Sequence, residues 1–340
     1  MNDDAPFQVL HEEDCPRWTG GRIVIYGYGN QGRAQALCLR DGGLPVVVAL
    51  RPGSPSREPA AADGLTVIEP VEAAKAELLV WAVPDEAMTD AAKGLGTVRA
   101  GSSWLFLHGL APRWGWIEPP ETVDILLLAP QGPGAALRSA YASGAGLPAA
   151  IAVEHDASGK AHQRLLAYAR AIGCARGGLF RTDLAEETVV DHFGEQAVLC
   201  GGVPALVRAA WETLVAAGYG PETAYIECLM QLKLLVDLMY KRGVEGMRRA
   251  VSPTALFGAR EYGAAVIGPE TRGRLTDLLK TLESGEFAAS WRATSKAGWN
   301  DGELTTERDD TFEAAGRRVR RCLRWPGLER SAVEKGRGAG

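Results

Sequence analysis

The sequence predicts an α/β fold in which an N-terminal, Rossmann-type, doubly wound parallel sheet is followed by an all-helical C-terminal domain. Between residues 21 and 153, short apolar runs alternate with helix-forming segments, which is typical of strands buried on both faces of a helix-covered parallel sheet. After about residue 183 these runs stop, and long amphipathic stretches replace them. The 340 residues are enough for about two domains with one core each.

Six apolar runs are the predicted strands, and helical or Gly- and Pro-punctuated segments separate them. The runs are RIVIY (22–26), PVVVAL (45–50), LLVWAV (78–83), WLFL (104–107), VDILLLA (123–129) and AAIAV (149–153). The long predicted helices of the second half lie at 185–201, 204–217, 222–242 and 271–284. We therefore expect a Rossmann domain over 1–182, a helical domain over 183–328 and a flexible tail over 329–340.

Charge and composition exclude several classes of protein. Lys and Arg number 37 against 42 Asp and Glu, so the formal charge is -5, without the positive excess of proteins that bind phosphate backbones. No run approaches the ~18 consecutive apolar residues of a membrane span, and the acidic start MNDDAPFQVLHEED does not resemble a signal peptide. The six cysteines lack CxxC spacing, which argues against a zinc site. We expect a cytoplasmic protein with no nucleic-acid or membrane partner.

A glycine-rich turn, GYGNQG (27–32), joins the first predicted strand to a helix. The first glycine of such a turn permits a tight bend, the second lets the backbone approach a pyrophosphate, and the third allows close helix–strand packing. Because the turn lies in a complete βαβ unit, it predicts dinucleotide binding; a glycine-rich turn without a ligand is the alternative. The candidate cofactor-binding residues are Gly27, Tyr28, Gly29, Asn30, Gln31 and Gly32.

The end of the second predicted strand indicates the type of cofactor. An acid at this place binds the ribose 2′-hydroxyl of NADH, whereas an Arg accommodates the 2′-phosphate of NADPH. The sequence has Arg51 there, followed by Ser54 and Ser56, with no acid before Glu58. A guanidinium and two hydroxyls suit a phosphate, so NADPH is expected rather than NADH. A solvated basic loop is the alternative.

His108 comes directly after the fourth predicted strand. Ligands of open α/β sheets lie at the carboxyl ends of the strands, so His108 is a candidate active-site residue. The alternative is a histidine that only packs in the cofactor-side loop.

Carboxylates at helical spacing form a second candidate site. Asp191 and Glu195 are four residues apart, as are Glu227 and Gln231, so each pair lies on one face of its helix. Such pairs on facing helices can hold divalent metals, and oxygen ligands suit Mg²⁺. A solvated face is the alternative, but apolar neighbours predict buried carboxylates, which need a partner. These neighbours are Phe193, Val198, Leu199, Leu229 and Leu232.

Eight segments, in order over about residues 20–325, resemble those of ketol-acid reductoisomerases, and the short helical half is similar to the compact bacterial class of that family. The segments are GYGNQGRAQAL (27–37), LRPGS (50–54), VPDE (83–86), LHGL (107–110), APQGPG (129–134), DASGKA (156–161), DHFGEQAVLCGG (191–202) and ETLVAAGYGPETAYIECLMQLKLLVDLMY (212–240). The resemblance implies NADPH, two Mg²⁺ ions, and helical domains that interlock as a homodimer around a knotted core. It implies an alkyl shift in an acetohydroxy acid, followed by reduction of the resulting ketone. It places Pro84 and His108 at the cofactor and assigns catalytic or metal-binding roles to Asp191, Glu195 and Glu227.

The chain departs from the family pattern in three places. The family has Glu where this chain has Gln231, which leaves three carboxylates instead of four, so one Mg²⁺ or none is expected. The family has Lys at the catalytic position of Gln131, and a Gln can donate a hydrogen bond but cannot release a proton at neutral pH. Ser252 keeps the family's substrate-binding hydroxyl, but Pro253 and Leu256 replace polar neighbours. We therefore expect a reshaped substrate pocket at Ser252 and Gln231.

These departures affect the two half-reactions unequally. Alkyl migration needs an alkoxide and a polarised ketone held together, whereas hydride transfer needs an aimed nicotinamide and one proton donor or Lewis acid. The leading hypothesis is an NADPH-dependent reductase of a small C=O or C=N substrate, with alkyl migration weak or lost. The alternatives are a genuine Mg²⁺-dependent ketol-acid reductoisomerase of branched-chain amino-acid biosynthesis and a catalytically dead cofactor-binding subunit. The apolar residues of 229–240 also predict a homodimer.

Overall fold

A computed structural model describes residues 7–299 and 311–323, and the predicted tail at 329–340 lies outside them. The chain divides into two compact units. Unit 1 runs to Asp191 and also includes Leu282–Ala297, whereas unit 2 comprises His192–Thr281 and the residues from Gly298 onward.

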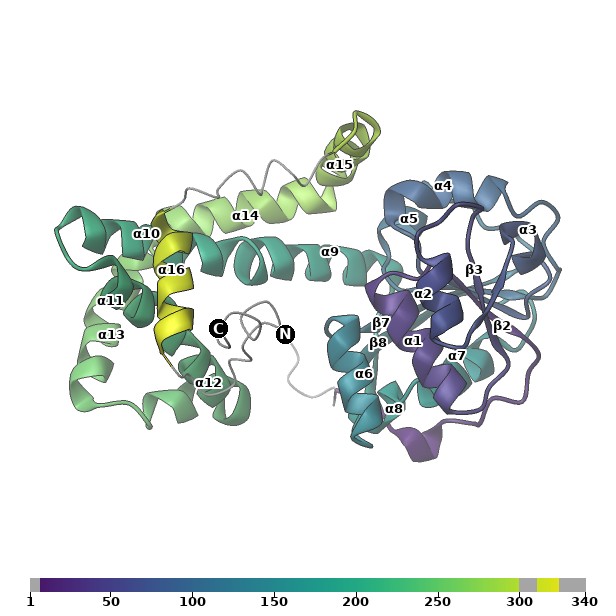
Figure 1. Ribbon diagram of the computed structural model, residues 1–340, viewed down its shortest axis with the longest axis horizontal. Coiled ribbons are helices and arrows are strands. Elements are labelled where there is room, and N and C mark those ends of the chain that lie inside the picture. The colour runs from purple at the N-terminus through teal and green to yellow at the C-terminus, as the bar shows by residue number, and fades with distance from the viewer. Residues whose placement is uncertain (1–6, 300–310, 324–340) are drawn as a thin grey trace, which may run out of the picture. The chain divides into compact units, whose positions relative to one another are not determined.

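Unit 1 is built on a sheet flanked by helices (Figure 1), and its strand order is β1-β9-β8-β7-β6-β5-β2-β3-β4. All neighbours from β7 to β4 are parallel, as are β8 and β9, while the pairs β7–β8 and β1–β9 are antiparallel. The chain runs outward from β2 to β4 and then returns to β5, so the predicted doubly wound fold is confirmed. The strands are β1 (Val9–Leu10), β2 (Ile23–Tyr26), β3 (Val46–Ala49), β4 (Thr66–Ile68), β5 (Leu78–Trp81), β6 (Ser103–Phe106), β7 (Asp124–Pro130), β8 (Ala149–His155) and β9 (Leu179–Arg181).

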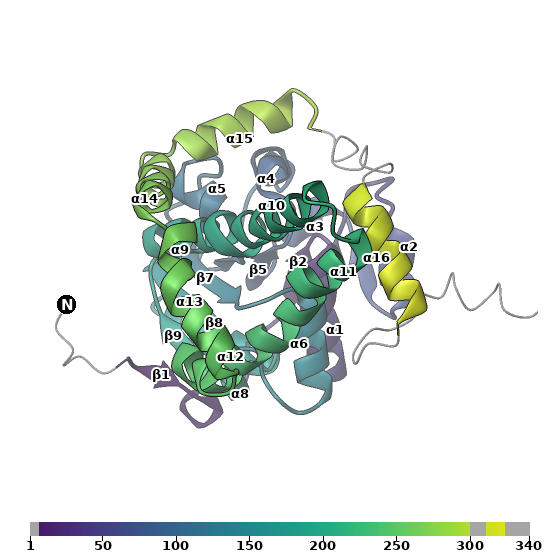
Figure 2. The same cartoon turned by 90° about the vertical axis from the view of Figure 1, so that its left-hand side faces the viewer.

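Helices cover both faces of this sheet, and each face has its own core (Figure 2). Alternate residues of β2 enter the two cores, Ile23 and Ile25 on one face and Val24 and Tyr26 on the other. The helices of unit 1 are η1 (Glu12–Asp14), α1 (Asn30–Asp41), α2 (Arg57–Ala62), α3 (Pro70–Ala73), α4 (Asp85–Lys93), α5 (Leu110–Arg113), α6 (Gly134–Ala142), α7 (Ala161–Ala171), α8 (Cys174–Gly177), the first turns of α9 (Leu184–Gly194), and α15 (Glu286–Lys296).

Helix α15 returns to unit 1 from far along the chain. Ala288 is buried in the core that also holds Trp116, and the guanidinium carbon of Arg292 lies 5.3 Å from the ring centroid of Trp116. Just before α15, the backbone at Gly285 passes so close to Trp114 that an added Cβ would lie 2.5 Å from its ring. Two separate stretches of chain therefore form unit 1.

The described part of unit 2 is helical, as the sequence predicts. Its core packs Trp211 and Tyr225 against Phe312, with ring centroids 5.2 and 4.9 Å apart. The expected apolar burial around the carboxylates is wrong for this single chain, because Val198 is 49% and Leu199 67% exposed. The remaining helical segments are the π-helical turns η2 (Glu195–Leu199) and η3 (Ile226–Met230), with α10 (Gly202–Ala216), α11 (Pro221–Tyr225), α12 (Gln231–Arg248), α13 (Pro253–Val266), α14 (Pro269–Glu283) and α16 (Thr311–Cys322).

One helical stretch of the described residues, Leu184–Ala216, is long and apolar enough to cross a membrane on length and composition alone. A single helix that meets this test is weak evidence for a membrane span.

Candidate active site

A cavity of about 1200 Å³ lies in unit 1 at the carboxyl ends of β2, β3 and β5. The strand order reverses between β2 and β5, and open α/β sheets bind their ligands at such a point. Most of the predicted cofactor-binding residues line this cavity: Gly27, Tyr28, Gly29, Asn30, Gln31, Arg51, Ser54, Ser56, Pro84 and His108.

Gly32 is the one residue of the predicted turn that does not line the cavity. It lets the start of α1 pack closely against Gly27 and Ala82. A Cβ at Gly32 would lie 2.6 Å from the carbonyl oxygen of Gly27, and one at Gly27 would lie 2.4 Å from that of Ala82. Gly27 also has a φ of +109°, which residues with a side chain rarely adopt. The turn is therefore held tightly against β5, and it opens α1 at the cavity, where a helix N-terminus favours an anion such as a pyrophosphate.

The loop after β3 brings the predicted phosphate-binding residues to the cavity. Arg51 is exposed there, and the hydroxyl of Ser54 accepts the backbone N–H of Ser56 at 3.3 Å. The next arginine, Arg57, has a different task, because its guanidinium pairs with Glu69 at 3.0 Å and anchors the start of α2. Arg57 is thus engaged by Glu69, whereas Arg51 is exposed at the cavity, which fits the prediction that Arg51 binds a 2′-phosphate.

Tyr28 joins the glycine-rich turn to the end of α2. Its hydroxyl donates to Oδ2 of Asp63 at 2.8 Å, and Arg33 of α1 binds both oxygens of the same carboxylate at 2.8 and 3.2 Å. Burial and the hydrogen bond to Asp63 raise the pKa of Tyr28 to about 12. The hydrogen bonds from Arg33 and Tyr28 lower the pKa of Asp63 to about 2. The phenol is therefore neutral and the carboxylate charged at neutral pH.

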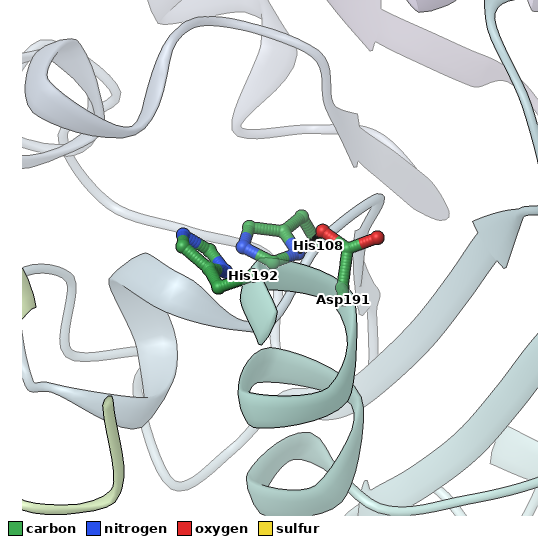
Figure 3. A group of neighbouring side chains, drawn as sticks. All are labelled: His108, Asp191 and His192. Atoms are coloured by element: carbon green, nitrogen blue, oxygen red, sulfur yellow. Dashed lines mark ion pairs between the residues drawn. The ribbon is translucent and has the colours of Figure 1, made fainter. Parts of the chain in front are cut away.

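His108 lies at the end of β6 beside the acids of α9 (Figure 3). Its Nδ1 is 3.0 Å from Oε1 of Glu187 and 3.5 Å from Oδ2 of Asp191. Burial alone would lower the pKa of His108, but the hydrogen bond to Glu187 and the charges of Glu187, Asp85 and Asp191 raise it to about 9. The imidazole is therefore a cation at neutral pH, placed at the wall of the cofactor cavity.

Glu187 is a candidate site residue that the sequence analysis missed. Its side chain is only 6% exposed, and its Oε2 accepts the backbone N–H of Gly109 at 2.8 Å. One signal was available, because Glu187 precedes Asp191 by the same four residues that separate Asp191 from Glu195. Three acids at this spacing mark one face of the helix.

Gln131 and Ser252 have local partners. Gln131 follows the last residue of β7, and its side-chain amide donates to the carbonyl oxygen of Ala129 at 3.1 Å. Ser252 is the N-cap of α13, where its hydroxyl accepts the backbone N–H of Ala255 at 3.2 Å. The catalytic role of Gln131 and the substrate-binding role of Ser252 stay predictions.

Both candidate metal-binding pairs lie at π-helical turns. Glu195 is the first residue of η2, and its carbonyl oxygen accepts the N–H of Cys200 at 2.7 Å, the i+5 bond of a π-helix. Glu227 lies in η3, and Gln231 donates its amide N–H to Oε2 of Glu227 at 2.7 Å, which confirms that this pair shares one face. Such turns are rare and are frequently found at functional sites.

Two family models match the chain in succession. The NADPH-binding domain of acetohydroxy acid isomeroreductase matches residues 18–178, and the C-terminal domain of ketol-acid reductoisomerase matches residues 184–325. The chain belongs to the ketol-acid reductoisomerase family. The resemblance of its motifs is thereby confirmed, and the chain carries the NADPH-binding domain of an oxidoreductase family.

Individual ketol-acid reductoisomerases agree with this assignment. A ketol-acid reductoisomerase (NADP⁺) of Kineococcus radiotolerans is 43% identical over 333 residues, which cover 95% of this chain and 94% of that protein. The structure of an NADH-preferring ketol-acid reductoisomerase from an uncultured archean is 36% identical, with a TM-score of 0.88 over 94% of this chain and 100% of that one. A semialdehyde dehydrogenase NAD-binding protein from Cupriavidus necator is 17% identical, with a TM-score of 0.57 over 88% of this chain and 99% of that one, and shares the fold alone.

The residues present suit the cofactors of a ketol-acid reductoisomerase. A cavity that joins a glycine-rich turn, a helix N-terminus and Arg51 matches a dinucleotide phosphate. Asp191, Glu195 and Glu227 offer carboxylate oxygens, the donor atoms that Mg²⁺ prefers.

Proposed function

We propose that this chain is an NADPH-dependent ketol-acid reductoisomerase that shifts an alkyl group within an acetohydroxy acid and reduces the resulting ketone. The carrying observation is the 43% identity to the Kineococcus enzyme across both domains. In support, the chain keeps His108, Asp191, Glu195, Glu227 and Ser252 at the positions to which the family pattern gives catalytic, metal-binding or substrate-binding roles.

The chain's own side chains supply binding and proton transfer. The turn GYGNQG and Arg51 bind the phosphates of NADPH, which fixes the nicotinamide toward the carboxyl end of the sheet. His108, charged and oriented by Glu187, can donate a hydrogen bond to the substrate oxygen that gains charge during hydride transfer. Asp191, Glu195 and Glu227 would hold Mg²⁺, which when bound polarises the oxygens of the substrate.

A second candidate function is reduction without migration, and two residues favour it. Gln131 stands where the family has a Lys, and Gln231 where it has a Glu. The amide of Gln231 donates to Oε2 of Glu227 and brings no negative charge of its own for a second Mg²⁺. With one ion or none, reduction of a small C=O or C=N substrate is the easier half-reaction.

Separate assays of the two half-reactions distinguish these functions. The test measures NADPH oxidation with Mg²⁺ on acetolactate, which requires both steps, and on the corresponding 3-hydroxy-2-keto acid, which requires only reduction. Comparable turnover on both supports the reductoisomerase. Turnover on the keto acid alone, with acetolactate activity restored in the double variant Gln131→Lys/Gln231→Glu, supports the reductase. NADPH binding without turnover on either compound contradicts the reductoisomerase and a reductase of this keto acid.

We further propose that the enzyme is a cytoplasmic homodimer that binds neither nucleic acid nor membrane. Several large apolar side chains of unit 2 are exposed in the single chain, more than a soluble monomer leaves in contact with water. Sedimentation equilibrium at micromolar concentration should give about twice the chain mass of 36.2 kDa. A species at 36.2 kDa would contradict the dimer. The exposed apolar side chains of unit 2 on which this proposal rests include Leu199, Tyr240, Phe257 and Tyr262.

A further inference from the structure

The glycine-rich turn touches the loop that carries Gln131. Helices α1 and α6, which begin at these two segments, lie side by side in both views (Figures 1 and 2). At Gly134, the first residue of α6, an added Cβ would lie 2.2 Å from the carbonyl oxygen of Asn30. Nothing larger than glycine fits there, so the backbones of the turn and the loop are in direct contact.

A hydrogen bond from Gln31 fixes the same loop. Its Nε2 donates to the carbonyl oxygen of Gly132 at 2.8 Å. Gly132 has a φ of +151°, a conformation that residues with a Cβ rarely adopt. Gly132 is the residue after Gln131, so this hydrogen bond holds the loop directly beside Gln131.

The Gln31 amide also connects this loop to the core. Its Oε1 accepts from Nε2 of Gln35 at 3.2 Å, and Oε1 of Gln35 accepts from the hydroxyl of Tyr168 at 2.6 Å. Gln35 and Tyr168 are both fully buried. Because the Gly132 carbonyl can only accept, Gln31 must present its N–H to it, and each amide along the chain Tyr168–Gln35–Gln31–Gly132 then has one satisfied orientation.

We propose that Gln31 is a positioning residue that couples the cofactor turn to the Gln131 loop, so that NADPH bound at the turn stabilises the loop in its catalytic position. Gln31 lines the cofactor cavity, yet its amide is committed to Gln35 and Gly132. The motif therefore needs a glutamine at this place for the neighbouring loop as much as for the dinucleotide. The catalytic part of this proposal rests on the proposed function, whereas the coupling itself does not.

Hydrogen exchange followed by mass spectrometry tests the coupling without any turnover. NADPH should slow exchange at residues 27–32 and at residues 131–137 in the wild type. In Gln31→Met, which keeps the volume but loses the hydrogen bonds, NADPH should still protect 27–32 but no longer 131–137. Gln31→Glu, which still accepts from Gln35 but sets an oxygen against the Gly132 carbonyl, should give the same result if Gln31→Met does not fold. The control is Gln163→Met, on the exposed face of α7, which should behave as wild type. Equal NADPH-dependent protection of 131–137 in wild type and Gln31 variants overturns the proposal.

A double-mutant cycle then tests the catalytic consequence. Gln31→Met should lower kcat about tenfold on whichever substrate the wild type turns over, with less than about a threefold change in the dissociation constant of NADPH. In a Gln131→Ala background the same change should lower kcat by less than about twofold, since the positioned side chain is gone. Independent, multiplicative effects of the two substitutions would refute the role of Gln131, even where the exchange data support the coupling.

Discussion

Glu187 binds both the side chain of His108 and the backbone of the following residue. Its Oε1 lies 3.0 Å from Nδ1 of His108, while its Oε2 accepts the N–H of Gly109 at 2.8 Å. One carboxylate of α9 therefore determines both the charge of the imidazole and the course of the chain after β6. The orientation of His108 toward the cofactor cavity depends on an acid that lies 79 positions further along the chain.

Removal of that charge should lower the pKa of His108. In Glu187→Gln, only Asp85 and Asp191 would still oppose burial, and the pKa should fall from about 9 by about 1 to 3 pH units. An NMR titration of the imidazole in metal-free protein measures this value, with His108→Asn to assign the signal. Glu186→Gln, a neighbouring exposed acid, should leave the pKa close to the wild-type value. An unchanged pKa in Glu187→Gln would show that Glu187 does not set this charge.

Arg51→Ala should weaken NADPH binding about tenfold to a hundredfold, because one charge-assisted contact to the 2′-phosphate is worth about 1.5 to 3 kcal/mol. NADH, which lacks this phosphate, should bind the variant as it binds the wild type. Fluorescence titration with both cofactors measures this difference, with Arg22→Ala, at the opposite end of β2, as the control. Equal affinities of the wild type for the two cofactors would be incompatible with a phosphate site at Arg51 and would resemble the NADH-preferring relative.

Gln231→Glu should bring two carboxylates together and make the fold sensitive to Mg²⁺. The 2.7 Å hydrogen bond from Gln231 to Glu227 would be replaced by like charges at i and i+4, which destabilise a helix by about 0.2 to 0.5 kcal/mol. The melting temperature should fall without Mg²⁺ and recover with it, and calorimetry should detect tighter or additional Mg²⁺ binding. Gln231→Met controls for the lost hydrogen bond alone. A Mg²⁺ response of the wild type equal to that of Gln231→Glu would contradict this prediction.

Asp63 should stabilise the fold at neutral pH and lose that contribution in acid. Its folded-state pKa of about 2 lies below that of an unfolded aspartate, so the contribution is complete above about pH 4 and disappears as the pH falls toward 2. Asp63→Asn should therefore reduce the free energy of unfolding by about 1 kcal/mol at pH 7, with a difference that shrinks between pH 4 and 2. Urea unfolding across this range measures it. A difference independent of pH would mean that the charge of Asp63 is not what Tyr28 and Arg33 recognise.

The sequence was sufficient for those parts of the fold that depend on local patterns. Continuous apolar runs predicted six buried strands, and the turn GYGNQG predicted the dinucleotide site, because strand burial and turn geometry leave a signal within a few residues. The strands β1, β4 and β9 were missed since two or three residues carry no readable period. The mixed direction of β7 and β8 depends on tertiary packing, which the pattern of either strand does not contain.

Several residues of the candidate site could be predicted from the sequence, but the contacts between them could not. His108 and Asp191 were identified one by one, from a strand end and from helical spacing, whereas Glu187 acquires its role only where α9 packs against the end of β6. Gln31 was assigned to the cofactor, although its amide bonds a loop about a hundred residues away. Contacts between distant segments leave no local trace in a single sequence, so such residues are missed or given too narrow a role.

Helix α15 is synthesised long after the part of unit 1 that it covers. Trp114 and Trp116 leave the ribosome about 170 residues before the helix that covers them, and at about 5 to 20 residues per second that interval lasts roughly ten to thirty seconds. Once β9 (Leu179–Arg181) has followed, the sheet is complete, but one apolar flank stays bare until α15 is made. A chain truncated after residue 191 would leave this flank bare permanently. We therefore expect the cofactor domain to be better behaved in isolation when α15 is grafted onto it or co-expressed with it.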